Sequence, residues 1–201
     1  HKVVAGVRSI EKARKQLFDF HNLELISFDF ENQETFENAF KPGDIVFLLR
    51  PPHISDIEKH LKPLLLKMKE KGVNQVVFLS VQGAEKSKRI PHHKIEKLIQ
   101  SLGFEYVFVR PSYFMQNLTS SLKKDIQDKQ LIILPSGKAL FNWVDVGNIG
   151  EVCAHLLCNF DKFKNHAYVL TGSENIDFKA VAQMISDEIQ QKIEFKSVNP
   201  I

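Results

Sequence analysis

The sequence contains only two cysteines among its 201 residues, Cys153 and Cys158. They lie five positions apart on a predicted helix and so on different faces, which argues against both a disulfide and a pair of metal ligands. We expect both to be buried thiols in a protein of the reducing cytosol. No metal site is predicted, because most of the histidines show no metal-ligand spacing. The scattered ones are His1, His21, His53, His60, His155 and His166.

Long apolar runs are also lacking. No stretch is long enough to span a bilayer and no signal peptide is visible, so we expect no membrane partner. The formal net charge is only +3 and the charges are interspersed, which gives no argument for nucleic acid. The length suits one domain, with the core sheet in residues 1–134 and smaller substrate-side elements in residues 135–201.

The glycine motifs of nucleotide sites are missing as well. None of the nine glycines forms G-x-G-x-x-G, and no GK[ST] occurs. Yet residues 3–8 resemble the second strand of a dinucleotide-binding sheet. In the usual strand order a first strand would lie between this strand and the one at residues 44–49. We therefore expect a strand–turn–helix unit of about 30 residues before His1. Without it, a dinucleotide's phosphates would lack a helix N-terminus.

Short apolar strands alternate with amphipathic helices along the whole chain. Residues 76–79 and 106–109 are apolar throughout, which is typical of strands covered on both faces. The alternation predicts an α/β fold: a doubly wound parallel sheet with helices on both faces, and a small C-terminal lobe on the substrate side. Residues 112–129 read mostly as helix. Four residues are predicted to cap helices, namely Ser9, Asn32, Asp145 and Asp177.

Polar groups gather where the central strands end. Ser80 follows one strand, His92 begins the next helix, and the segment at residues 110–117 follows the second strand. Ligands of open α/β sheets bind at these ends, so we expect the chemistry between these groups. No G-x-S-x-G surrounds Ser80, so an acyl-transfer triad is not predicted.

Several stretches spread over nearly the whole chain resemble one family. They read VAGVR, SFDF, FLSVQGAE, PHHKIEKLIQSLGFEYVFVRPSYFMQNL, FNWVDVGNIGEVCAHLL and YVLTGSENIDF. With them the chain resembles the NmrA-like family of atypical short-chain dehydrogenases/reductases. The resemblance implies a Rossmann-like fold that binds NAD(P), here without the N-terminal glycine-rich unit.

The resemblance places Arg8 where the family meets the adenosine ribose. A basic residue there suits a 2′-phosphate, which implies NADP (NADPH) rather than NAD. Ser9 and Lys12 lie close enough to help. The alternative is that Arg8 is a solvated charge at a strand end.

Further residues match cofactor-contacting positions of the family. Asp29 and Phe30 match the positions that contact adenine, although Phe30 would serve equally well in the core. Leu49 and Arg50 match the strand end that passes under the cofactor, and Pro51-Pro52 would rigidify that loop. Ser80 and His92 complete the implied cofactor-binding set.

The usual Tyr-x-x-x-Lys pair is absent. Lys88 stands at the tyrosine position and His92 at the lysine position. The resemblance includes active members with a lone lysine or histidine there. His92 is therefore a candidate for donating a proton to a carbonyl oxygen at neutral pH, and Glu96, one turn later, would orient its ring. The alternative is a hydrogen bond near the helix start.

The remaining candidates are implied by the same resemblance. Ser80 and Tyr113 join His92 as catalytic candidates, although Ser80 could instead bond the turn backbone. Phe114, Gln116 and Asn117 lie in the substrate-facing segment, where aromatic and amide groups would hold a planar ring such as a quinone.

Three functions are compatible with these residues. The first is an NADPH-dependent oxidoreductase of the cytoplasm that acts on a quinone or another small carbonyl acceptor. The second is a non-catalytic, redox-sensing regulator that binds NADP(H) and a protein partner. A sugar-nucleotide epimerase ranks last, because that chemistry normally needs the missing tyrosine. A homodimer and a regulatory partner are left open.

Overall fold

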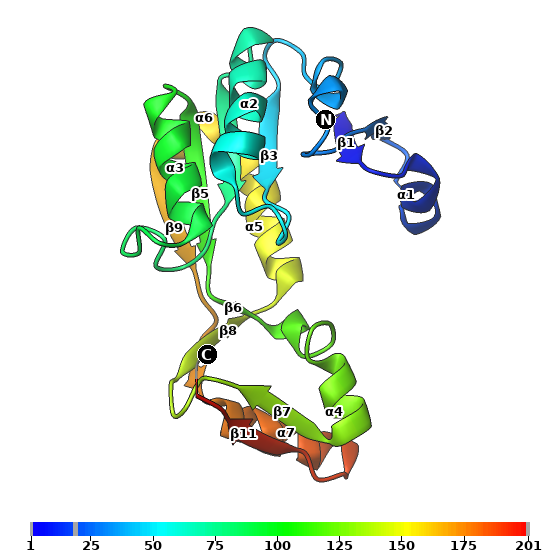
Figure 1. Cartoon of the computed structure of the whole chain (residues 1–201), viewed down its shortest axis with the longest axis vertical. Coiled ribbons are helices and arrows are strands. Elements are labelled where there is room, and N and C mark those ends of the chain that lie inside the picture. Colours follow the sequence, from blue (N-terminus) through cyan, green and yellow to red (C-terminus); the bar gives the residue numbers. More distant parts are fainter. Residues whose placement is uncertain (1, 18–19, 200–201) are drawn as a thin grey trace. The chain divides into compact units, whose positions relative to one another are not determined.

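The structure is a computed structural model that describes residues 2–17 and 20–199. Its contacts divide the chain into two units. The first unit comprises His1–Phe108 and Phe160–His166, and the second comprises Val109–Asn159 and Ala167–Ile201. From Val3 to Pro111 strands alternate with helices along the chain, as Figure 1 shows. The predicted α/β architecture with parallel strand pairs is therefore confirmed.

The first unit contains a two-stranded sheet, β1-β2, and strands of a four-stranded sheet in the order β3-β4-β5-β9. The pairs β1/β2 and β3/β4 are parallel. The elements are β1 (Val3–Val7), α1 (Ile10–Gln16), β2 (Leu23–Ser27), η1 (Gln33–Phe36), β3 (Ile45–Leu49), α2 (Ile57–Glu70), β4 (Gln75–Leu79), α3 (Pro91–Ser101) and α6 (Phe160–Phe163), together with the first parts of β5 (Glu105–Pro111) and β9 (His166–Leu170), which continue into the second unit.

Local side chains set where these helices begin. The Ser9 hydroxyl accepts a hydrogen bond from the Lys12 amide, and the Asn32 side chain accepts one from the Glu34 amide, as predicted. Asp56 caps α2 in the same way. Helix α1, which Ser9 begins, ends at Gln16. Pro63 does not divide α2, which runs unbroken from Ile57 to Glu70.

Strand β4 is buried on both faces. Val76, Val77 and Phe78 are all fully buried, although successive side chains of a strand point to opposite faces. Val107 and Phe108 in β5 repeat the pattern. Both faces of these two strands are therefore buried, as their unbroken apolar sequences predicted.

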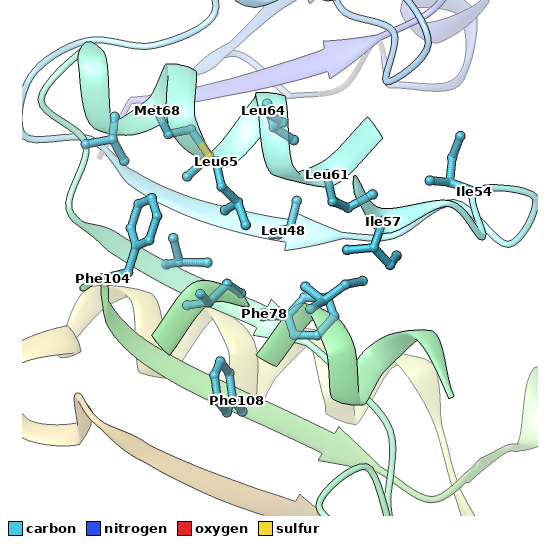
Figure 2. Packing of buried hydrophobic residues seen from close by; sticks show 14 of the residues in the cluster. Leu48, Ile54, Ile57, Leu61, Leu64, Leu65, Met68, Phe78, Phe104 and Phe108 are labelled. Atoms are coloured by element: carbon cyan, nitrogen blue, oxygen red, sulfur yellow. The ribbon is translucent and has the colours of Figure 1, made fainter. Parts of the chain in front are cut away.

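One hydrophobic core lies between this sheet and the helices α2 and α3. Figure 2 shows Leu61, Leu65 and Met68 from α2 pointing towards strand residues that include Leu48 and Phe78. Helix α3 contributes Ile95 and Ile99. The apolar side chains recur every three or four residues along each helix, so one face of the helix meets the sheet. This packing fixes where the beginning of α3 lies relative to the end of β4.

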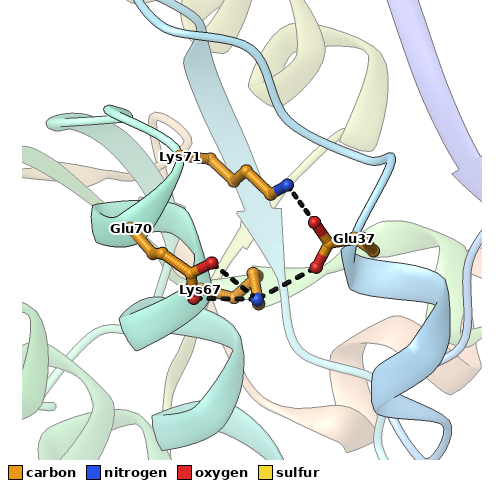
Figure 3. A network of polar contacts seen from close by, with 4 residues as sticks. All are labelled: Glu37, Lys67, Glu70 and Lys71. Atoms are coloured by element: carbon orange, nitrogen blue, oxygen red, sulfur yellow. Dashed lines mark hydrogen bonds and ion pairs between the residues drawn. The ribbon is translucent and has the colours of Figure 1, made fainter.

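A network of charges joins α2 to the segment after η1. The Lys67 ammonium lies 3.0 Å from a Glu37 carboxylate oxygen and 2.8 Å from one of Glu70, and Lys71 pairs with the same Glu37, as Figure 3 shows. The hydrogen bond from Lys71, followed by that from Lys67, lowers the pKa of Glu37. Exposed pairs of this kind contribute little individually, so the apolar core remains the main attachment of α2.

Two strand edges of the first unit expose apolar side chains. Val3 and Val4 in β1 are 54% and 44% exposed, and Phe47 and Leu49 in β3 are 41% and 55% exposed. Strand β1 pairs with β2 and β3 pairs with β4, within separate sheets. The strand expected between β1 and β3 stays a prediction.

The second unit is built around aromatic side chains. Trp143 and Phe178 are buried together with Leu122, Ile132 and Val181. Its sheets have the orders β10-β8-β6 and β11-β7. The elements are β6 (Tyr113–Phe114), η2 (Met115–Asn117), α4 (Lys123–Lys129), β7 (Leu131–Leu134), β8 (Phe141–Val144), α5 (Val146–Cys158), β10 (Asn175–Ile176), α7 (Phe178–Ile189) and β11 (Glu194–Ser197).

Two expectations for the second unit are corrected. Residues 112–129 are not one helical stretch, because Tyr113 and Phe114 pair with Trp143 and Val144 as a strand and the helical parts are the 3-10 helix Met115–Asn117 and the α-helix Lys123–Lys129. Cys153 is buried, and burial raises its pKa to about 11, but Cys158 is exposed. Both cysteines are free thiols. Within the described residues, no helix has the length and apolar character needed to cross a membrane.

Candidate functional site

Ser80 and Glu96 form a buried pair at the carboxyl end of β4. Ser80 directly follows the strand and is 1% exposed, and Glu96 on α3 is 4% exposed. The Ser80 hydroxyl donates to a Glu96 carboxylate oxygen at 2.6 Å, the length of a charge-assisted O–H···O bond. A serine hydroxyl has a single proton, so this bond uses the only donor of the Ser80 side chain.

His92 lies on the first turn of α3, directly after Pro91. Its ring stacks on Phe78 with the centroids 6.0 Å apart. Burial, and then the positive charge of Arg50, lower the pKa of His92 to about 4, while Glu96 opposes them. The imidazole is therefore neutral at pH 7 and offers an N–H donor rather than an extra proton. This differs from the expectation of direct proton donation at neutral pH.

Arg50 is anchored by the loop that follows β3. Its Nη1 donates to the carbonyl oxygens of Pro51, Pro52 and Ile54 at 2.9, 2.9 and 2.7 Å. Its Nε is buried without a hydrogen-bond partner, and burial lowers the pKa of the guanidinium. The two prolines, which the sequence indicated only as a rigid loop, thus supply acceptors that fix a positive charge close to His92.

The predicted adenosine-side residues gather at the end of β1. Arg8 and Lys12 are exposed, and neither side chain forms an ion pair within the described residues. The Ser9 hydroxyl caps α1 by accepting from the Lys12 amide at 3.3 Å. This arrangement leaves two cationic side chains near one strand end.

The predicted adenine-side residues have structural partners. The Asp29 carboxylate accepts from the Glu31 amide at 2.9 Å, which closes a tight turn. Phe30 is half-buried and meets Phe28 edge to face at 5.2 Å. Leu49 remains exposed at the end of β3. The core role considered for Phe30 is thus observed, while contact with adenine stays a prediction.

The predicted substrate-side residues lie in the second unit. Tyr113 packs against Trp143 and Phe178, with ring centroids 4.8 and 5.4 Å apart, and burial raises its pKa. Gln116 donates to the Asp145 carboxylate and accepts from the Val146 amide at 3.0 Å, so its side-chain amide fixes the start of α5. Asp145 also caps this helix, as predicted.

Phe114 and Asn117 are half-buried in the same unit, Phe114 in β6 and Asn117 in η2. The Asn117 side chain bonds to Tyr113 and lowers the pKa of that phenol, against the effect of burial. The substrate roles of this segment, and its meeting with His92, stay predictions. Ser80, His92 and Arg50 belong together in the first unit.

The sequence predicted His92 and Glu96 from their spacing but missed two features. It gave no sign that Ser80, sixteen residues before Glu96, would be its hydrogen-bond partner. It also gave no sign that the Arg50 guanidinium would fold back on its own loop. Within residues 2–17 and 20–199, no group of three or more metal-ligating side chains comes together.

Comparisons with known proteins agree with the resemblance seen in the sequence. The NmrA-like family matches residues 1–201. "Prestalk A differentiation protein A" of Dictyostelium discoideum is 33% identical over 173 residues, which cover 86% of this chain and 56% of that protein. The chain spans about three fifths of the length of the other curated relatives it matches most strongly.

Two solved structures share the fold. An NADPH-dependent quinone oxidoreductase of Escherichia coli, in complex with NADPH, superposes with a TM-score of 0.83 at 15% identity, over 98% of this chain and 69% of that one. The triphenylmethane reductase of Citrobacter sp., in complex with NADP(H), gives 0.76 at 20% identity, over 98% and 70%. At these identities the likeness establishes the fold, which is Rossmann-like, and nothing more.

Proposed function

Because the chain belongs to the NmrA-like family, we propose that the protein is an NADPH-dependent oxidoreductase that reduces a quinone or another small carbonyl acceptor. The observation that carries the proposal is the group formed by Arg50, His92 and Glu96 at the carboxyl ends of β3 and β4, where open α/β sheets bind ligands. The quinone and dye reductases with this fold support the choice of acceptor.

The residues of the chain fit the adenosine end of NADPH. Arg8 and Lys12 are exposed cations without ion-pair partners in the described structure, and they lie at the strand end where the 2′-phosphate would be held. A guanidinium matches a phosphate with two parallel charge-assisted hydrogen bonds. A carboxylate in place of Arg8 would suit NAD instead.

The cofactor, when bound, supplies a hydride to the acceptor. His92 would donate a hydrogen bond from its neutral ring to the acceptor oxygen, and the fixed charge of Arg50 would favour the negative charge that develops there. The oxygen then takes its proton from water.

The function is tested by following the absorbance of NADPH with the purified protein and a panel of small quinones and enals. We expect the oxidation of NADPH to depend on the acceptor and to saturate with it. Saturable NADPH binding without turnover on any acceptor of the panel would contradict the proposal.

The cofactor preference gives a second test. Replacing Arg8 by alanine removes a charged donor, and such bonds are worth about 1.5–3 kcal/mol. We expect NADPH to bind at least about tenfold more weakly and NADH to bind as before. Arg14→Ala is the matched control, because Arg14 is an exposed cation on the last turn of α1. An equal loss of affinity for both cofactors would show that Arg8 does not meet the phosphate.

A redox-sensing regulator is the second candidate function. Lys88 stands where the catalytic tyrosine of short-chain dehydrogenases would be, which favours binding without turnover. In that case NADP(H) would change the affinity of the protein for a partner. A pull-down that captures the same partners with and without NADPH would contradict it.

A further inference from the structure

We propose that Glu96 is a positioning residue for His92, and that Ser80 acts by holding Glu96 rather than by touching substrate. The proposal rests on the function proposed above, since it concerns the same site. Ser80 and Glu96 are both almost completely buried, whereas His92 is only partly buried. Of the three, His92 is therefore the side chain that a ligand can reach.

The hydrogen bond between Ser80 and Glu96 fixes the orientation of the Ser80 hydroxyl. Its only proton points at the carboxylate, 2.6 Å away, so its remaining capacity is as an acceptor. A carbonyl acceptor cannot receive a hydrogen bond from the Ser80 hydroxyl while this bond is in place. The hydrogen bond to the acceptor oxygen must then come from another group, and the ring N–H of the partly buried His92 can supply it.

A buried carboxylate needs compensation, because removing a charge from water is costly. The Ser80 hydroxyl supplies a hydrogen bond to Glu96. Arg50 and Glu96 act on the His92 ring with opposite signs: the positive charge of Arg50 lowers the pKa of His92, and Glu96 raises it. We infer that the hydrogen bond from Ser80 holds the negative charge of Glu96 in place near the His92 ring. This negative charge opposes the effect of the positive charge of Arg50 on the same ring.

Three elements near His92 contribute to this balance. The loop after β3 contributes the cation Arg50, and helix α3 contributes Glu96, one turn after His92 on the same face. Strand β4 contributes the uncharged ring of Phe78, stacked on the imidazole. Removing the charge of Glu96 should therefore make His92 harder to protonate.

The test is an NMR titration of the His92 ring, which needs neither cofactor nor turnover. Glu96→Gln removes the charge but keeps the shape and an oxygen for Ser80. We expect the proton affinity of His92 to fall about tenfold. Ser80→Ala should shift it in the same direction, because the carboxylate loses the hydrogen bond that stabilises its charge. Glu70→Gln, which removes an exposed carboxylate of the same unit, should leave it unchanged.

An unchanged His92 titration in folded Glu96→Gln or Ser80→Ala protein would overturn the proposal. Activity provides the second reading: in Glu96→Gln we expect kcat to fall about tenfold while the KM for NADPH stays the same. A shifted titration in a protein that never oxidises NADPH would uphold the positioning role and reject the proposed function. The two failures are therefore distinguishable.

Discussion

Replacing Gly172 by alanine is expected to lower the melting temperature by on the order of 10 °C. A Cβ at this position would lie 2.0 Å from the backbone oxygen of Trp143, well inside contact distance. The obstacle is backbone rather than a flexible side chain, so β8 and the Gly172 segment would have to separate. Overpacking of this kind costs about 3 kcal/mol or more when the surroundings cannot yield.

The surroundings of Gly172 cannot yield easily, because Asn142 ties the two segments together. Its side-chain oxygen accepts from the Gly172 amide, and its Nδ2 donates to the carbonyl oxygens of Gly172 and Glu174 at 3.3 and 3.1 Å. Strand β8 also carries Trp143, which packs against Phe178 in the core of the second unit. Separating the segments would strain both the hydrogen bonds and the aromatic cluster.

Gly150→Ala is the matched control for this substitution. Gly150 lies inside α5, and a Cβ there would meet nothing within 4 Å. Alanine is the better helix former, so this change should stabilise the protein by about 0.5–1 kcal/mol. Thermal unfolding followed by circular dichroism measures both variants. A Gly172→Ala protein that melts with the wild type would show that the close approach to Trp143 is not present in solution.

The parts of the fold that the sequence predicted are those with local causes. Ser9, Asn32, Asp145 and Asp177 each accept a hydrogen bond from an amide two or three residues later, so the residue and its partner are neighbours in the sequence. The two central strands were predicted because their unbroken apolar stretches reflect burial on both faces.

The parts that the sequence missed depend on residues far apart in the chain. Tyr113 lies in a strand because it pairs with Trp143, thirty residues later, and no local pattern announces that pairing. The sequence also gave no sign that the Gln116 amide would hold Asp145 and Val146 at the start of α5, while its predicted substrate role stays a prediction. An amide side chain fits both roles, so residue type alone could not distinguish them.

The same limit applies to the candidate site. The four-residue spacing of His92 and Glu96 was visible, because a helix places such residues on one face. The lowered pKa of His92 was not visible in the sequence, since it depends on burial and on Arg50, which follows a different strand, β3. The sequence thus predicted the pairing of His92 with Glu96 but not the protonation state of the His92 ring.

Replacing His92 by alanine is expected to reduce kcat/KM for NADPH-dependent reduction about 100-fold. The loss corresponds to removing one hydrogen-bond donor from the acceptor oxygen, which typically costs a factor of about 100–1,000. His92→Gln keeps an N–H donor and should retain part of the rate. His21→Ala is the control, because His21 is exposed and precedes β2, at the amino end of the strand.

The pH profile separates the two ways in which His92 could act. Its pKa of about 4 lies below the ordinary value because burial and Arg50 disfavour the charged ring, so the ring is neutral above that pH. If the neutral His92 ring donates the hydrogen bond, titration of His92 should leave the rate unchanged from about pH 5.5 to about pH 7.5. If the protonated ring were the active form, the rate would fall about tenfold for each pH unit over the same range. Such a fall, absent from His92→Gln, would reject the neutral donor and make His92 a general acid.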